Sequence, residues 1–143
     1  MKKLFNLSFF YLILGLALGI FFREFTKFNA FTGITTLSAA HTHTLVLGFI
    51  FFLILIVLEK VFNISNIKYF IGWLITYNIG LLSLISTLVV RGILEVLNKD
   101  FIGLPHIAGT AHAILGISLI WFMIILKNQF LLNNLKKELT HNN

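Results

Sequence analysis

The stretch TTLSAAHTHTLVLGFIFFLILIVL, residues 35–58, carries no charged side chain and is apolar over most of its length. Three other runs have the same character, at residues 4–22, 69–90 and 107–126. A helix needs about 20 apolar residues to cross a hydrocarbon core of about 30 Å, and inside that core the backbone must satisfy its own hydrogen bonds. The sequence therefore predicts an all-α integral membrane protein with four spanning helices.

The composition of the whole chain agrees with a membrane location. Of 143 residues, 58% are hydrophobic and only 11% are charged, so a soluble domain of this length would expose large apolar patches. The absence of cysteine excludes disulfides, iron–sulfur clusters and thiolate metal sites. Although the formal net charge is +6, the lysines and arginines stand at the ends of the apolar runs. This placement predicts the lipid bilayer as a partner and excludes nucleic acid.

Short connections between the runs favour an up-down-up-down four-helix bundle, in which sequential helices are antiparallel neighbours. The first run is expected to be retained, because it ends with Phe21 and Phe22 and is followed by Arg23, where a signal peptide would have small residues. We expect the spanning domain at residues 1–127 and a polar cytoplasmic tail at residues 128–143.

The basic residues predict the orientation of this bundle. Seven lysines lie on the side of the termini and the middle loop: Lys2, Lys3, Lys60, Lys68, Lys127, Lys136 and Lys137. Four basic residues lie on the other side: Arg23, Lys27, Arg91 and Lys99. Because cytoplasmic loops carry the excess of Lys and Arg, both termini are expected in the cytoplasm of a multi-pass cell-membrane protein.

Two features inside the runs predict contacts between helices. Gly15 and Gly19 form a Gly-x-x-x-Gly pair, which permits close packing either within the bundle or between copies of the chain. Tyr77 and Asn78 fall deep in the third run, where their polar groups need partners inside the protein. We expect both side chains to form hydrogen bonds between helices.

Four of the five histidines lie near the beginning of the second and fourth runs: His41, His43, His106 and His112. Both runs enter the bilayer from the same side, so this cluster is expected near the extracytoplasmic face. At a rise of 1.5 Å per residue, His43 and His112 lie roughly 6 Å and roughly 8 Å below the boundary. Ionisable side chains at such depth usually face the bundle interior or a cavity, which favours His43 and His112 as a ligand pair. For His41 and His106 singly, a solvated position at the interface is an equal alternative.

Small residues surround the predicted ligands. Gly109 and Gly116 stand three residues before and four after His112, which leaves room for a flat, wide cofactor such as a porphyrin. His41 and His43 are about 200° apart around a helix, so both cannot point at one centre. Arg91 ends the third run on the histidine side, where it would pair with heme propionates or simply extend to the interface.

The segment HTHTLVLGF, residues 41–49, resembles the His-x-His-x-x-x-x-Gly helix of small heme-binding relatives of heme–copper oxidase subunit I and of NnrS-type proteins. Residues 108–116 resemble the second histidine helix of a bacterial four-span family of unknown function. This resemblance implies heme b at His43 or His41 and leaves copper at a second centre, with His41 and His106, as an option. The oxidase subunit resembles three four-helix arcs, which implies a homotrimer first and a homodimer second. The chain departs from the oxidase in having four spans instead of twelve and no histidine–tyrosine copper centre.

These observations predict a membrane heme b-binding protein related to heme–copper oxidase subunit I, with a role in electron transfer or in gas or redox sensing. If the protein is an enzyme, it is an oxidoreductase. Two alternatives stay open: a histidine-based protein that binds or transports copper or zinc, and an assembly helper of a respiratory complex.

Overall fold

The computed structural model describes the backbone of residues 1–141 and the side chains of residues 1–133. Within this part the chain is helical and contains no strand, so the predicted all-α class is confirmed. The elements are α1 (Lys2–Phe28), α2 (Leu37–His43), the π-helical segment η1 (Thr44–Ile50), α3 (Phe51–Phe62), the short 3₁₀ turn η2 (Ile64–Asn66), α4 (Phe70–Val96) and α5 (Leu104–His141). The segments α2, η1 and α3 follow one another without a break and together form the second of four long helices.

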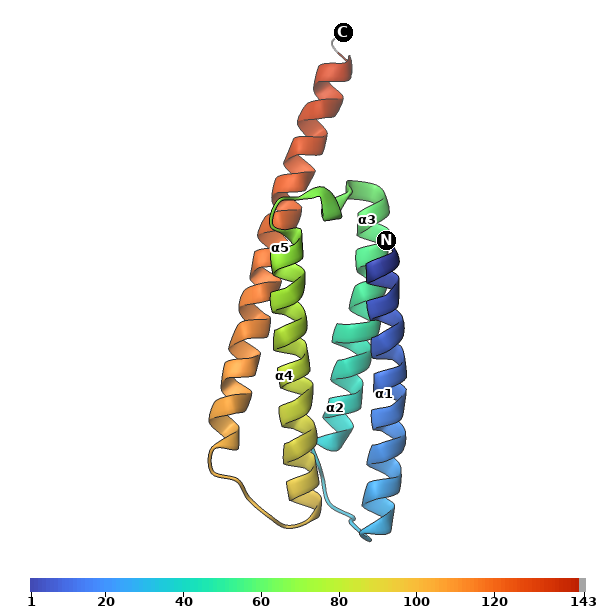
Figure 1. The fold of residues 1–143 in the computed structure, drawn as a ribbon, viewed down its shortest axis with the longest axis vertical. Helices are drawn as coiled ribbons and strands as arrows, with labels where there is room; N and C mark the ends of the chain where they lie inside the picture. The colour runs from blue at the N-terminus through green and yellow to red at the C-terminus, as the bar shows by residue number, and fades with distance from the viewer. Residues whose placement is uncertain (142–143) are drawn as a thin grey trace.

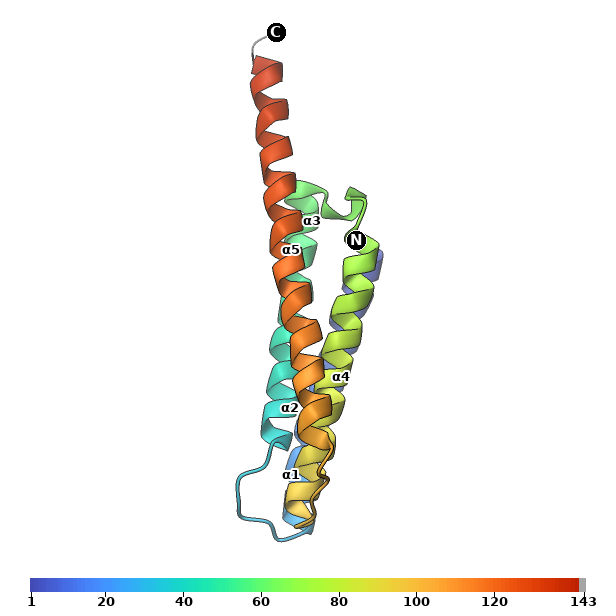
Figure 2. The ribbon, with the colours of Figure 1, turned by 90° about the vertical axis from the view of Figure 1, so that its left-hand side faces the viewer.

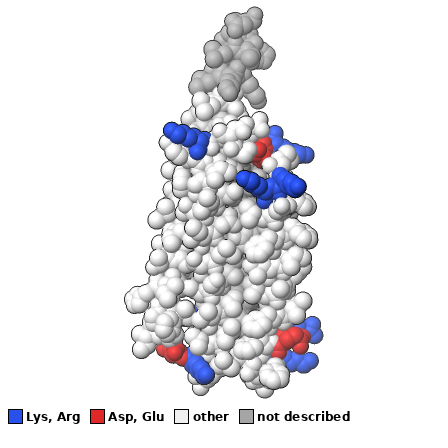
Figure 3. All heavy atoms as spheres, viewed as in Figure 1, with Lys and Arg blue, Asp and Glu red and all other residues white. Residues whose placement is uncertain are grey.

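All four long helices are long and apolar enough to cross a membrane: Lys2–Phe28, Leu37–Phe62, Phe70–Val96 and Leu104–Asn133. Charged side chains gather at the two ends of the molecule, and an uncharged band separates them (Figure 3). Large apolar side chains point outward within this band, for example Ile20 at 66% and Ile117 at 64% exposure. Such a surface suits lipid and not water, so the chain is a multi-pass membrane protein.

Successive long helices run in opposite directions, as Figures 1 and 2 show. Helix α1 packs along α2, η1 and α3, while α5 packs along α4. Contacts between α2 and α4 join these two pairs into one bundle. Helix α5 continues past the bundle to His141, so residues 128–141, expected as a polar tail, prolong the fourth helix, and residues 142–143 lie outside the described part.

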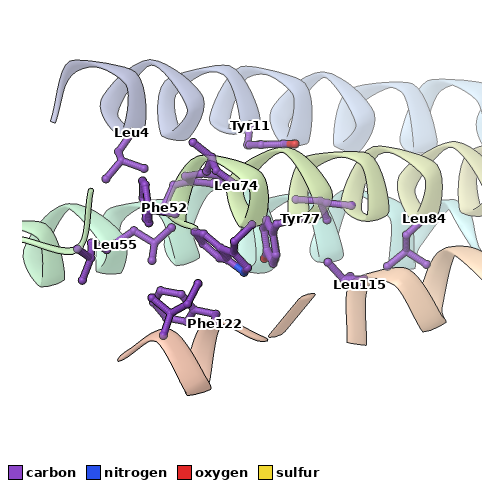
Figure 4. Close-up of a cluster of buried hydrophobic side chains, with 14 of the residues drawn as sticks. Leu4, Tyr11, Phe52, Leu55, Leu74, Tyr77, Leu84, Leu115 and Phe122 are labelled. Atoms are coloured by element: carbon purple, nitrogen blue, oxygen red, sulfur yellow. The ribbon is translucent and has the colours of Figure 1, made fainter. Parts of the chain in front are cut away.

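The core is rich in aromatic side chains (Figure 4). Tyr11, Phe52, Trp73 and Tyr77 are fully buried, and the Trp73 ring stacks on Phe122 of α5 with centroids 4.6 Å apart. The indole Nε1–H of Trp73 also donates to the Ser118 carbonyl at 2.8 Å. Each aromatic pair of this kind contributes about 0.5–1.5 kcal/mol beyond its buried area. This contribution matters in a bilayer, where association of helices depends on packing and hydrogen bonds.

Gly15 belongs to the interior of the bundle. A Cβ atom at this position would lie 2.6 Å from Leu45 Cδ2, so α1 approaches the second long helix as closely as glycine permits. A Cβ atom at Gly19 would lie 3.7 Å from Cδ2 of His41. Both glycines of the Gly-x-x-x-Gly pair thus face their own bundle, which supports the first of the two interpretations of this motif and removes it as a seam between copies.

The two deep polar residues of α4 make the expected hydrogen bonds between helices. The Tyr77 hydroxyl donates to the Leu47 carbonyl at 2.7 Å. The Asn78 side-chain oxygen accepts from the Tyr11 hydroxyl at 2.7 Å, and its amide donates to the Leu74 carbonyl at the same distance. The prediction for Tyr77 and Asn78 is therefore confirmed.

A carboxylate from α4 holds the beginning of α2. Glu95 Oε2 accepts from the Thr36 backbone N–H at 2.7 Å and from the Thr36 hydroxyl at 3.1 Å. Thr35 adds a hydrogen bond from its hydroxyl to the Gly92 carbonyl at 3.0 Å. Since the N-terminus of a helix carries orphan N–H groups and a partial positive charge, an acidic partner there stabilises it.

Candidate functional site

The N-terminal ends of α2 and α5 lie at the same end of the bundle (Figure 1). His41 and His43 lie on α2, and His106 and His112 lie near the beginning of α5. Their individual surroundings differ: His41 and His43 are half-buried, whereas His106 and His112 are exposed.

His43 has one ring nitrogen held by the backbone. Its Nδ1 lies 2.8 Å from the Ala39 carbonyl, one helical turn back. A carbonyl can only accept, so this hydrogen bond requires the proton on Nδ1 and leaves the lone pair on Nε2. Beside the ring lies a shallow hollow lined by Thr42, His43, Val46 and Leu47. An imidazole in this form is prepared to bind a metal through Nε2.

His112 has the same arrangement on α5. Its Nδ1 lies 2.8 Å from the Ala108 carbonyl, again four residues back, so Nε2 again carries the lone pair. Cβ atoms at Gly109 and Gly116 would meet nothing within 4 Å, so the face of α5 around His112 is open. Both bonds go to the backbone carbonyl four residues back, an acceptor that any residue at that position of a helix would supply.

His41 faces a different neighbour. Its ring stacks on Phe22 of α1 with centroids 6.2 Å apart, and it lies next to Gly19. The buried Nδ1 of His41 has no hydrogen-bond partner within the structure. His41 and His43 therefore have separate surroundings, as their angular separation on the helix predicted, and His41 is the one that faces its own bundle.

The two remaining predicted residues lie at the edge of this end. His106 is an exposed residue in the first turn of α5. The Nε–H of Arg91 donates to Glu95 Oε1 at 3.1 Å, and the arginine side chain is 55% exposed. Arg91 and Glu95 also line a hollow with Lys99, Asp100 and the beginning of α5.

Among the described residues, no group of three or more His, Cys, Asp or Glu side chains is arranged to hold a metal ion. A structural zinc site needs about four such donors and a catalytic one about three. The described histidines therefore form no site of either kind by themselves.

The features that sequence reasoning missed lie inside the second long helix. η1 was not expected, and neither was the contact that Ser8 makes with it; Tyr77 was expected to bond another helix, but not a π-helical segment. Gly48 lies within η1, and it is the residue of the sequence by which the position of this segment could have been recognised.

The fold defines a multi-pass α-helical membrane protein, with two histidines on α2 and two near the beginning of α5. The chain belongs to a family described as a protein of unknown function, DUF2871, whose model matches residues 1–129. The expected four-span family of unknown function is thereby confirmed. No curated protein and no solved structure matches the chain, so the resemblance to heme–copper oxidase and NnrS-type proteins gains no support from these comparisons.

Proposed function

We propose that this chain is a membrane heme b protein in which Nε2 of His43 and Nε2 of His112 are the axial ligands. The observation that carries the proposal is the matched pair of hydrogen bonds from Nδ1 to the Ala39 and Ala108 carbonyls, both 2.8 Å. Metal-binding histidines almost always donate their second ring N–H in this way, which fixes the tautomer and orients the ring. The role that we assign is electron transfer or gas or redox sensing.

The number of donors favours heme over a bare metal ion. Zinc or copper would need three or four protein donors, and the described residues hold no group of three. Heme brings four nitrogen donors of its own, so two histidines from different helices are sufficient. This argument ranks heme ahead of the copper or zinc transport alternative.

The shape of the helix surfaces also suits a flat apolar ring. The hollow beside His43 is lined by Val46 and Leu47 as well as Thr42, and the open face around His112 carries Gly109 and Gly116. In this proposal the two alanine carbonyls orient the imidazoles, and the glycines leave space for the ring. Arg91 supplies a guanidinium at the same end for a propionate. Heme held there would carry one electron between its ferric and ferrous states.

The visible spectrum of the protein, purified in detergent after expression with heme supply, tests the proposal. We expect a Soret band that His43→Ala and His112→Ala each abolish or convert to a different ligation state. His141→Ala serves as a control that leaves the band unchanged, since His141 is expected in the tail and its side chain lies outside the described part. A spectrum without a Soret band, or equal tolerance of all these substitutions, refutes the proposal. Stoichiometric copper or zinc without heme would favour the alternative.

A second measurement needs no heme. Nitrogen-15 NMR of the heme-free protein should find His43 and His112 protonated on Nδ1 and not on Nε2, because each Nδ1 donates to a carbonyl. Nε2–H tautomers at both positions would contradict the assignment of the ligand atoms.

We further propose that copies of this chain associate, with a homotrimer first and a homodimer second, and that the histidine end faces outside the cytoplasm. Exposed imidazoles at His106 and His112 are costly against lipid and acceptable at a contact between proteins. Mass measurement of the complex in detergent distinguishes these states, and a monomer that still binds heme would show that one bundle is sufficient.

A further inference from the structure

The second long helix is not α-helical throughout. The backbone N–H of Phe51, the residue directly after η1, donates to the carbonyl of Val46 within η1, five residues back. A π-helical segment therefore accommodates an additional residue between α2 and α3. Such segments are rare and occur frequently at functional sites.

A helix that returns from i−5 to i−4 pairing leaves one carbonyl without an amide donor, and in a membrane this acceptor needs another partner. Two side chains supply donors to η1. The Tyr77 hydroxyl of α4 donates to the Leu47 carbonyl at 2.7 Å, and the Ser8 hydroxyl of α1 donates to the Phe49 carbonyl at 3.1 Å. Tyr77 is fully buried and Ser8 is 2% exposed, so neither hydroxyl has water as an alternative.

The backbone of η1 also lies against a fixed aromatic ring. A Cβ atom at Gly48 would lie 2.5 Å from Tyr11 Cγ, so the ring of Tyr11 rests directly on this part of the helix. The Tyr11 hydroxyl is bound to Asn78 of α4 at 2.7 Å. Figure 4 shows Tyr11 and Tyr77 in the same core, on α1 and α4. η1 is thus held from two neighbouring helices.

We propose that Tyr77 and Ser8 are positioning residues that hold η1 in its π conformation and thereby determine the direction in which His43 points. If η1 relaxed to α-helical pairing, the additional residue that the π segment accommodates would take an ordinary position in the helix. α2 would then turn by about 100° relative to α3 and shift by about 1.5 Å along the axis. His43 lies on α2, directly before η1. The π segment therefore sets the side of the helix from which Nε2 is presented, an inference whose importance for ligation rests on the proposed function.

Distance measurements between spin labels test this inference on the protein without heme. The chain has no cysteine, so labels can be placed at single introduced cysteines without other changes. One pair joins Thr42→Cys on α2 to Ile120→Cys on α5, and the control pair joins Val57→Cys on α3 to the same site. All three residues are exposed. The distances are compared with and without the combined substitutions Tyr77→Phe and Ser8→Ala. Tyr77→Phe keeps the ring that stacks on Phe51 at 4.8 Å.

We expect the Thr42–Ile120 distance distribution to shift by up to about 8 Å or to broaden, since a rotation of about 100° moves a side chain by this amount. The Val57–Ile120 distribution should not change. The matched control Thr76→Val removes the hydroxyl next to Tyr77 that donates to Gly72 within α4, and it should alter neither distance. An unchanged Thr42–Ile120 distribution in the double variant overturns the inference, and so does a change in both distributions.

The heme signal supplies the second readout. If His43 is an axial ligand, Tyr77→Phe should change the electron paramagnetic resonance spectrum of the ferric heme or lower the heme content, whereas Thr76→Val should do neither. A wild-type protein without heme would refute the proposed function alone, because the label distances still decide the role of Tyr77 and Ser8.

Discussion

His41 and His43 stand two residues apart and meet different surroundings. The ring of His41 lies on Phe22 of α1, and its buried Nδ1 has no partner. The ring of His43 lies beside a surface hollow and is held by the Ala39 carbonyl. A hydrogen bond of this kind restricts rotation of the imidazole, which favours His43 over His41 for the proposed heme ligation.

We expect the replacement of Gly48 and of Gly116 by alanine to have different effects on the unfolding temperature. Gly48→Ala would place a Cβ atom 2.5 Å from Tyr11 Cγ, and the Tyr11 ring cannot withdraw because it stacks on Phe52 at 5.5 Å. We expect a loss of stability of about 1–3 kcal/mol, measured as a lower unfolding temperature in detergent. Equal unfolding temperatures for Gly48→Ala and wild type would show that Tyr11 can move.

Gly116→Ala is the matched substitution on α5. A Cβ atom there meets nothing within 4 Å, so the unfolding temperature should stay the same or rise slightly with the better helix propensity of alanine. The heme content should fall, because the added methyl group occupies space that the proposed ring uses beside His112. Full heme content with Gly116→Ala would mean that this face of α5 does not contact the ring.

At the scale of the elements, the first residue of α2 lies beside the last turns of α4 in space. Glu95 of α4 accepts from the backbone N–H and the hydroxyl of Thr36, the residue directly before α2, and Arg91 holds the second carboxylate oxygen. The beginning of the second long helix depends on such contacts, because the first N–H groups of a helix have no partners within it.

Glu95→Ala should therefore loosen the beginning of α2. The expected loss is about 1 kcal/mol, with faster hydrogen exchange at the Thr36 amide and the residues that follow it. Glu24→Ala is the control, because Glu24 pairs with Arg23 only at 3.7 Å and both side chains are largely exposed. Equal exchange in the two variants would show that Glu95 is not the acceptor that holds this end.

At the scale of the whole molecule, charged side chains at two ends enclose an uncharged band (Figure 3). The last turn of α3 carries Lys60 and the loop after it carries Lys68 near one end, and the loop after α4 carries Lys99 and Asp100 near the other. The difference in basic residues between the ends predicts which of them faces the cytoplasm.

Single cysteines test this orientation, since the chain has none of its own. In intact cells, a maleimide that cannot cross the membrane should label Lys99→Cys and should reach Lys60→Cys only after the cells are permeabilised. The reverse pattern would place the histidine end in the cytoplasm.

Local sequence was sufficient for the four helices, because the length of an apolar run and the need for internal hydrogen bonds decide a membrane span without reference to distant residues. The shared end of the four histidines followed from the alternating direction of the helices. The tertiary structure alone decided the rest: the π segment at residues 44–50, the place of Gly15 inside the bundle, and which of His41 and His43 faces its own bundle. These features depend on the rotation of each helix about its axis. That rotation is set by contacts such as Tyr77 with Leu47, between residues far apart in the chain, which no local pattern encodes.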